Sequence, residues 1–361
     1  MDPKLKYIAG TFLVQANEAF LNGGGLAAGE DQTTTMPKFM WVNGQKVPYV
    51  SSQSWKHWLR STLIEETGWD SSPLRAVGWN QKGNTAKIAG MLNPIDYRED
   101  DIFGYMFAFK LKDVPKTLTE EQQQIIDTLP KTQVVRPAIF LASLLAAIQT
   151  KGALSKDDAF VHLSGDSTPL PYTTGFYNAD LNAIFGIDVS RLGVFNNLDE
   201  TEINPELIDP ALEAGKIELQ SPETPKDNNA MYRMVNIDAY RKECICSLIG
   251  ALGVLRGGAK LAQFGVDVSP KVLICVGLDF CAPILNNLFE LDETDKPRLN
   301  IELLTEIMGD YKGRVTTKLI IGIRKDYLAN DAEVRELKNI DDIEVVITTP
   351  TQVATVLGES L

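Results

Sequence analysis

The chain has 361 residues, of which 44% are hydrophobic and 23% charged, so it can bury a sizeable core as one elaborated domain or two modest ones. Its 48 acidic side chains outnumber its 35 Lys and Arg, and the net charge of −13 argues against an extensive basic surface for nucleic acid. The excess is regional: residues 1–60 carry +2, whereas 199–227 alone hold nine acids and two lysines. Because binding depends on the local electrostatic field, the net charge does not exclude a basic groove near the amino terminus.

The sequence contains no export signal or membrane span that we recognise. "MDPKLKYIAG" lacks an apolar core of signal-peptide length, and the longest apolar run, which starts at Pro137, is too short to cross a bilayer. We therefore expect a buried helix at 137–149 and a cytoplasmic protein. The cysteines are expected to be core residues, because the two histidines lie far from them in sequence. They are Cys244, Cys246, Cys275 and Cys281.

The first elements of the chain are predicted to be strands. Residues 6–15 form a strand-like run, and a long polar, glycine-rich excursion follows it. Residues 39–50 then have the pattern of a hairpin, with Asn43-Gly44 as its turn.

A helix is predicted from Ser52 to about Glu66, because serines favour helix amino termini and the apolar residues that follow recur at helical spacing. The apolar stripe consists of Trp55, Trp58, Leu59 and Leu63.

The rest of the chain mixes helices and strands. Helices are predicted at 117–129, where Thr119 and Gln122 form a capping box, and at 238–255 and 300–311. Strands are predicted at 271–280, 316–325 and 342–350, and the polar segments 151–175 and 199–232 are predicted to be loops or arms. This order indicates an α+β fold with an RNA-recognition or ferredoxin-like core that carries large insertions.

One candidate site lies at the start of the predicted helix, in "VSSQSWKHWLR". Lys56 and Arg60 are spaced i, i+4 and share a helix face, which Ser52 begins and Gln53 flanks. The free amides of a first helical turn favour an anion, so this face could follow successive phosphates of a single strand. The alternative is an ordinary amphipathic helix with a solvated basic face.

Two glycine-rich stretches are further candidates. "LRGGAK" places Arg256 and Lys260 around Gly257-Gly258, where a glycine turn lets backbone and cations approach phosphate; the alternative is a simple helix C-cap. "LNGGGLAAGEDQ" at 21–32 lacks the Gly-Lys-Ser/Thr of a nucleotide-binding P-loop and is either a polymer-contacting loop or a plain surface loop.

Catalytic chemistry has little support in the sequence. His57 and His162 have no evident Ser/Asp partnership, and we find no nucleophile elbow, metal-binding His pair or dinucleotide fingerprint. Asp31, in the glycine-rich loop, is the one carboxylate to consider. We predict no catalytic residue, no metal and no cofactor.

Several of these blocks, in this order, resemble one known family. "VPYVSSQSWKHWLRSTL", "EDDIFGYMFA", "TGFYNADLNAIFGIDVSRLGVFN" and "LRGGAKLAQFGVDVSP" are similar to the CRISPR-RNA-binding backbone subunit of type I Cascade complexes, in the DevR-type, type I-B-like branch of the RAMP superfamily. The resemblance covers most of residues 6–281. It implies a palm at about 1–66 and 256–361, an inserted finger region at about 67–135, and a thumb with associated insertions at about 136–255.

The resemblance also implies a function. The subunit would bind crRNA without catalysing a reaction, assemble with copies of itself and other Cascade subunits into a filament, and present the guide for pairing with target DNA. A nuclease-helicase or transposition proteins would be the effectors, and no membrane would be involved. The expected RNA-binding residues are Asn22, Ser52, Gln53, Lys56, His57, Arg60, Arg136, Arg256, Gly257, Gly258 and Lys260.

Two other functions stay open at this point. One is a type III-like backbone subunit that cleaves target RNA with a metal and a loop aspartate such as Asp31. The other is a protein-interaction domain that is unrelated to RNA.

Overall fold

A computed structural model describes residues 2, 4–24, 34–80, 82–108, 118–149, 154–161, 165, 170–226 and 229–361. The chain divides into two compact units, each built from separate stretches of sequence. Unit 1 comprises Met1–Glu66, Ala142–Gly186 and Cys246–Leu361, and unit 2 comprises Thr67–Leu141 and Ile187–Ile245. No helix among the described residues is long and apolar enough to cross a membrane.

Unit 1 holds the large sheet and most of the helices. Its strands are β1 (Tyr7–Ala19), β2 (Thr34–Thr35), β3 (Phe39–Val42), β4 (Gln45–Val50), β10 (Leu145–Ala147), β11 (Leu154–Val161), β12 (Leu170–Asp188), β16 (Val272–Leu278), β17 (Phe289–Leu291), β18 (Pro297–Leu299), β19 (Leu319–Ile323), β20 (Asn339–Ile340) and β21 (Ile343–Thr348). Its helices are α1 (Ser52–Thr67), α6 (Leu261–Phe264), α7 (Ile301–Tyr311), α8 (Asp331–Glu336) and α9 (Val353–Ser360).

Unit 2 is made of shorter elements. They are β5 (Arg75–Trp79), β6 (Thr85–Ala89), α2 (Arg98–Phe103), β7 (Tyr105–Phe107), α3 (Glu120–Asp127), β8 (Val134–Arg136), β13 (Val194–Asn196), α4 (Ile208–Glu213), β14 (Ile217–Lys226) and β15 (Asn229–Met234). Residues of both units occur in β9 (Phe140–Ala142) and α5 (Ile237–Gly253), and the last residues of α1 and β12 belong to unit 2.

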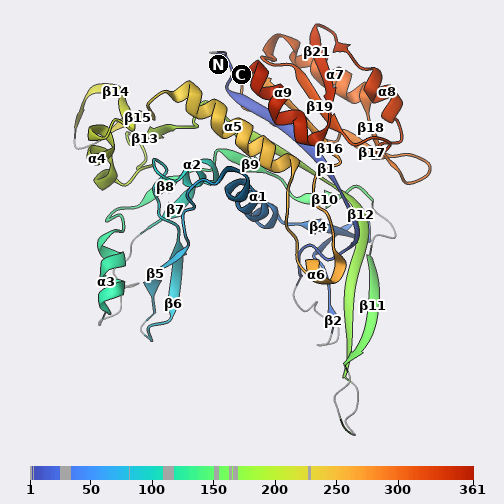
Figure 1. Ribbon diagram of the computed structural model, residues 1–361, viewed down its shortest axis with the longest axis horizontal. Helices are drawn as coiled ribbons and strands as arrows, with labels where there is room; N and C mark the ends of the chain where they lie inside the picture. Colours follow the sequence, from blue (N-terminus) through green and yellow to red (C-terminus); the bar gives the residue numbers. More distant parts are fainter. Residues whose placement is uncertain are drawn as a thin grey trace. The chain divides into compact units, whose positions relative to one another are not determined.

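The sheet of unit 1 has the order β20-β21-β19-β16-β1-β12-β10-β4-β3, and β2 and β11 also pair with β12. Neighbours β1 and β16 are antiparallel, as are β16 and β19, whereas β19 and β21 are parallel. All seven residues of β16 are buried, as expected for a central strand covered on both faces. Beyond the sheet, β11 and the first part of β12 form a long two-stranded arm (Figure 1).

Helix α1 packs on this sheet through its tryptophans. Trp55 is fully buried, its ring centroid lies 5.3 Å from that of Phe12 on β1, and its indole Nε1–H donates to the carbonyl of Ser143 at 2.8 Å. Trp58, Leu59 and Leu63 are buried on the same side. The helix therefore has a fixed orientation, with Lys56 and Arg60 outside the apolar stripe.

Most predicted elements are confirmed. The hairpin of β3 and β4 turns at Asn43 and Gly44, both with positive φ, and Thr119 and Gln122 form the capping box of α3. The predicted helices at 52–66, 238–255 and 300–311 correspond to α1, α5 and α7. The three predicted carboxy-terminal strands correspond to β16, β19 and β21.

Two predictions about local structure are wrong. Residues 137–149 form the short strands β9 and β10 instead of a helix, because Leu145 pairs with Val50 and Ala146 with Asn182 across the sheet. Of the segments predicted as loops or arms, 151–175 contains the arm of β11 and the start of β12, whereas 199–232 forms α4, β14 and most of β15, which are not loops. Polar, proline-containing sequence is compatible with such half-exposed strands, and their partners lie elsewhere in the chain.

The cysteine prediction holds in part. Cys244 and Cys275 are buried, and burial raises the pKa of Cys275 to about 12, but Cys246 is only partly buried and Cys281 is exposed. The mixed α/β class with a large sheet is confirmed. The assignment of palm, finger and thumb stays a prediction.

Candidate nucleic-acid interface

Helix α1 presents the predicted basic face. Backbone amides of Ser54 and Trp55 both donate to the carbonyl of Ser51, which begins the helix. Lys56 and Arg60 are partly buried, and Gln53 and His57 are exposed. Burial lowers the pKa of Lys56, and no described residue forms a hydrogen bond or ion pair with its ammonium group. A half-buried cation without a protein counter-ion is well placed to bind an anion.

The glycine turn after α5 lies directly on α1. The amide of Arg256 donates to Thr62 Oγ1 at 3.1 Å, and the Thr62 hydroxyl in turn donates to the carbonyl of Arg256 at 3.3 Å. Gly257 lies against Trp58, where an added Cβ would come within 2.2 Å of the indole Cγ. Gly258 has a φ of +120°. Glycine is therefore required for both the conformation and the close approach.

Residues 20–22 complete this surface. The side-chain amide of Asn22 donates to Ser54 Oγ at 3.0 Å, and the carbonyl of Leu21 accepts from the amide of Ala259 at 3.0 Å. The Oδ1 atom of Asn22 is buried and has no hydrogen-bond donor among the described residues. Three segments that are far apart in sequence thus meet at one place, and the resemblance assigned residues of all three to RNA binding, which stays a prediction.

Lys260 lies on the same surface but has partners. Its ammonium nitrogen is 4.7 Å from the ring centroid of Phe20 and 3.3 Å from Thr174 Oγ1, to which it donates. Its own φ of +52° is left-handed, so the backbone turns sharply at this cation. Lys260 therefore links the glycine turn to β12 and to Phe20, the residue that follows β1.

Arg256 is held by two carboxylates of α1. Its guanidinium donates to Glu66 at 2.7 Å and to Glu65 at 2.9 Å, and these hydrogen bonds raise the pKa of Arg256. The group is exposed, so these pairs are screened and exchangeable. A phosphate would have to compete with both glutamates for this cation.

Arg136 was expected to contact RNA, and the structure excludes it from the interface. Its side chain is fully buried in unit 2, where it is ion-paired with Asp101 and Glu202. It also donates to the carbonyls of Val194 and Arg191, at 2.7 and 3.0 Å. The guanidinium thus neutralises buried acids and holds the unit together, and solvent cannot reach it.

Some residues next to the candidate interface were not predicted from the sequence. Lys38 is tied to the interface because its amide donates to the carbonyl of Asn22 at 2.8 Å. Next to it, the β3–β4 hairpin exposes Trp41 beside Phe39 and Lys46. No spacing rule marks these residues, although aromatic residues beside lysines in "PKFMWVNGQK" are a weak signal. Asp31 and His162 lie outside the described residues.

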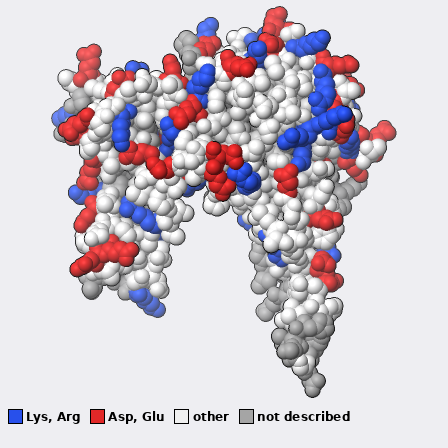
Figure 2. Space-filling view, viewed as in Figure 1, with Lys and Arg blue, Asp and Glu red and all other residues white. Residues whose placement is uncertain are grey.

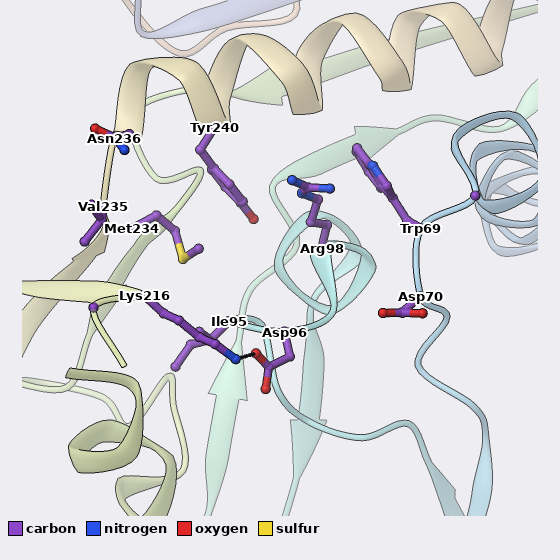
Figure 3. Close-up of a pocket in the computed structure, with 12 residues that line it drawn as sticks. Trp69, Asp70, Ile95, Asp96, Arg98, Lys216, Met234, Val235, Asn236 and Tyr240 are labelled. Atoms are coloured by element: carbon purple, nitrogen blue, oxygen red, sulfur yellow. Dashed lines mark hydrogen bonds and ion pairs between the residues drawn. The ribbon is translucent and has the colours of Figure 1, made fainter. Parts of the chain in front are cut away.

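A separate cavity of about 590 Å³ occurs in unit 2 (Figure 3). Arg98 points between two of its aromatic walls, with its guanidinium carbon 4.6 Å from the ring centroid of Trp69 and 5.9 Å from that of Tyr240. Both cations at this cavity already have acidic partners, since Arg98 pairs with Glu243 and Lys216 with Asp96. It is therefore not an obvious phosphate site.

Acidic and basic side chains are mixed on the face of the molecule that Figure 2 draws. Figure 2 shows Lys and Arg interspersed with Asp and Glu over the face in view. Basic residues that act on a nucleic acid would therefore act in small groups, as on α1.

No protein-family model matches the chain, and no curated protein matches it in sequence. Solved structures are similar in fold. A chain of a "CRISPR RNA-guided surveillance complex, pre-nicking" aligns over 98% of this chain and 100% of its own length, with a TM-score of 0.53 and 11% identity. A chain of a "CRISPR RNA-guided surveillance complex" aligns over 98% and 99%, with a TM-score of 0.50 and 9% identity. The protein therefore shares its fold with subunits of CRISPR RNA-guided surveillance complexes.

Proposed function

We propose that the protein is a non-catalytic, guide-RNA-binding backbone subunit of a type I-like CRISPR complex. Unit 1 would supply an RNA-recognition-like palm, and the arm of β11 and β12 would be the thumb. Copies of the chain would line up along a crRNA, together with other subunits of the complex, and the bound guide would pair with target DNA.

The half-buried ammonium of Lys56 supports this function most directly. It has no counter-ion among the described residues, and it lies on the helix where Asn22 and the glycine turn converge. A phosphate diester would supply the missing charge. Such contacts are indifferent to base sequence, as a subunit that holds any guide requires.

Purified full-length protein provides the test. We expect a high ratio of absorbance at 260 and 280 nm, and large particles on size-exclusion chromatography that collapse after ribonuclease. The double variant Lys56→Ala, Arg60→Ala should lose the RNA and still fold. A matched variant, Lys312→Ala, Lys325→Ala, removes the same charge from exposed positions of unit 1 and should retain the bound RNA.

Titration with labelled single-stranded RNA at several salt concentrations sharpens the result. The logarithm of the affinity should fall with the logarithm of salt by about 0.7 for each phosphate contact, so the Lys56/Arg60 variant should lose about 1.4 from the slope. A protein that purifies without nucleic acid and fails to bind added RNA would contradict the proposed function. Equal binding by the wild type and the Lys56/Arg60 variant would remove α1 from the interface.

A further inference from the structure

The β3–β4 hairpin carries an exposed group of two aromatic rings and one cation. Phe39 and Trp41 are two residues apart on β3 and therefore lie on the same face of the strand. Lys46 lies directly opposite Trp41 in the pairing register. The two rings meet edge to face, with centroids 6.0 Å apart and an interplanar angle of 87°. The ammonium nitrogen of Lys46 lies 4.7 Å from the Phe39 centroid and 5.6 Å from the Trp41 centroid.

The three side chains of this group contact one another, but none of them is buried. Trp41 is 66% exposed, and β3 is the last strand in the main order of the sheet. No carboxylate among the described residues pairs with Lys46. A large exposed indole held by its neighbours marks a binding surface better than a scattered apolar side chain does.

The hairpin is continuous with the interface on α1. Lys38 immediately precedes Phe39; its amide donates to the carbonyl of Asn22, and its carbonyl accepts from the amide of Tyr49 on β4 at 3.1 Å. Asn22 in turn donates to Ser54 on α1. Hydrogen bonds through Lys38 and Asn22 therefore connect the hairpin that carries the rings to the helix that carries Lys56 and Arg60, within unit 1.

We propose that Trp41, supported by Phe39 and Lys46, stacks on an unpaired nucleobase of the RNA strand whose phosphates lie along α1. An aromatic face beside cations is the recurring chemistry of single-strand recognition, because every base has a π-face. Lys46 would serve twice, since it holds the rings by cation–π contact and adds positive charge for the backbone. A protein partner on this face would instead bury Lys46 and have to bring a carboxylate to it.

This inference rests on the proposed function, and the test separates the two. The affinity of the full-length chain for oligouridylate is compared with that for an abasic ribose-phosphate strand of equal length. Trp41→Ala should weaken oligouridylate binding by about ten-fold, which is within the range of one lost stacking contact, and leave abasic binding unchanged. Trp41→Phe should retain most of the affinity. Ile88→Ala, at a strand residue that is 65% exposed in unit 2, should have no effect.

Tryptophan fluorescence gives a second readout. The chain has five tryptophans, and the emission of Trp41 is the difference between the spectra of the wild type and of Trp41→Phe. Oligouridylate should quench wild-type emission, and Trp41→Phe should lose that component. If Trp41→Ala binds oligouridylate as tightly as the wild type does, the stacking proposal is overturned and the proposed function is not. The same conclusion holds if Trp41→Ala keeps its RNA affinity but loses self-association, since Trp41 would then contact a second copy of the chain. Failure of the wild type to bind either strand would overturn both proposals.

Discussion

Gly257 lies against the indole of Trp58, so closely that a Cβ at residue 257 would come within 2.2 Å of the indole Cγ. Its φ of +154° is also one that other residues rarely adopt. The contact joins the glycine turn to the helix that carries Lys56 and Arg60. Both parts of the proposed interface therefore depend on a residue that has no side chain.

Gly257→Ala should consequently disturb the interface more than it disturbs the fold. We expect a loss of about 1–3 kcal/mol in the free energy of unfolding, from overpacking, together with weaker RNA binding. Gly265→Ala is the matched control, since Gly265 also has positive φ but faces open space. Urea denaturation measures the stability of both variants, and titration measures their RNA affinity. Equal stability and equal affinity of the two variants would refute the packing argument.

Lys56→Met should stabilise the fold while weakening RNA binding, because it removes a half-buried charge that no described residue neutralises. The pKa of Lys56 is lowered in the folded state, so the unfolded chain binds more protons between that pKa and the ordinary lysine value. Wild-type stability therefore rises with pH across this alkaline window, and the advantage of the variant should shrink there. Thermal melts from neutral to alkaline pH measure this, and an advantage that grows with pH would contradict it.

Glu65→Gln, Glu66→Gln should increase RNA affinity several-fold, because it releases the Arg256 guanidinium from both carboxylates and leaves it available to a phosphate. The gain should vanish when Arg256→Ala is added. Glu302→Gln, Glu306→Gln on α7 changes the net charge equally and should have little effect. A gain that persists without Arg256 would mean that loss of the two glutamate charges, and not release of Arg256, raises the affinity.

Arg136→Met should destabilise unit 2 by about 3–5 kcal/mol, because it leaves Asp101 and Glu202 buried without their cation. Under conditions in which the variant is folded, its RNA affinity should equal that of the wild type. Denaturant unfolding and RNA titration below the melting temperature separate the two effects. Loss of RNA binding by a fully folded variant would return Arg136 to the interface.

The helices were the easiest elements to predict. α1 has serines at its start and an apolar stripe, and α3 has its capping box, so each is specified by residues a few positions apart. The carboxy-terminal strands are apolar runs bounded by polar residues. The candidate interface on α1 was predicted for the same reason, since Lys56 and Arg60 are neighbours on successive turns of one helix.

The errors arose where distant segments decide the structure. Residues 140–147 are apolar enough for a helix, but pairing with β4 and β12 makes them strands. Arg136 is a cation like any other in sequence, and its acidic partners lie 35 and 66 residues away. The exposure of Trp41 likewise depends on which strand ends the sheet. Local patterns carry none of this information.

The order of β1 in the sheet has a consequence for synthesis of the chain. β1 is made first, yet its neighbours in the sheet, β12 and β16, are made much later. Because domains generally fold as units, β1 cannot complete its place in the sheet before these later strands have been made. The same delay applies to the surface around Asn22, Lys56 and Gly257. Under the proposed function, a nascent chain would therefore lack the surface that binds a guide, and only finished subunits would compete for it.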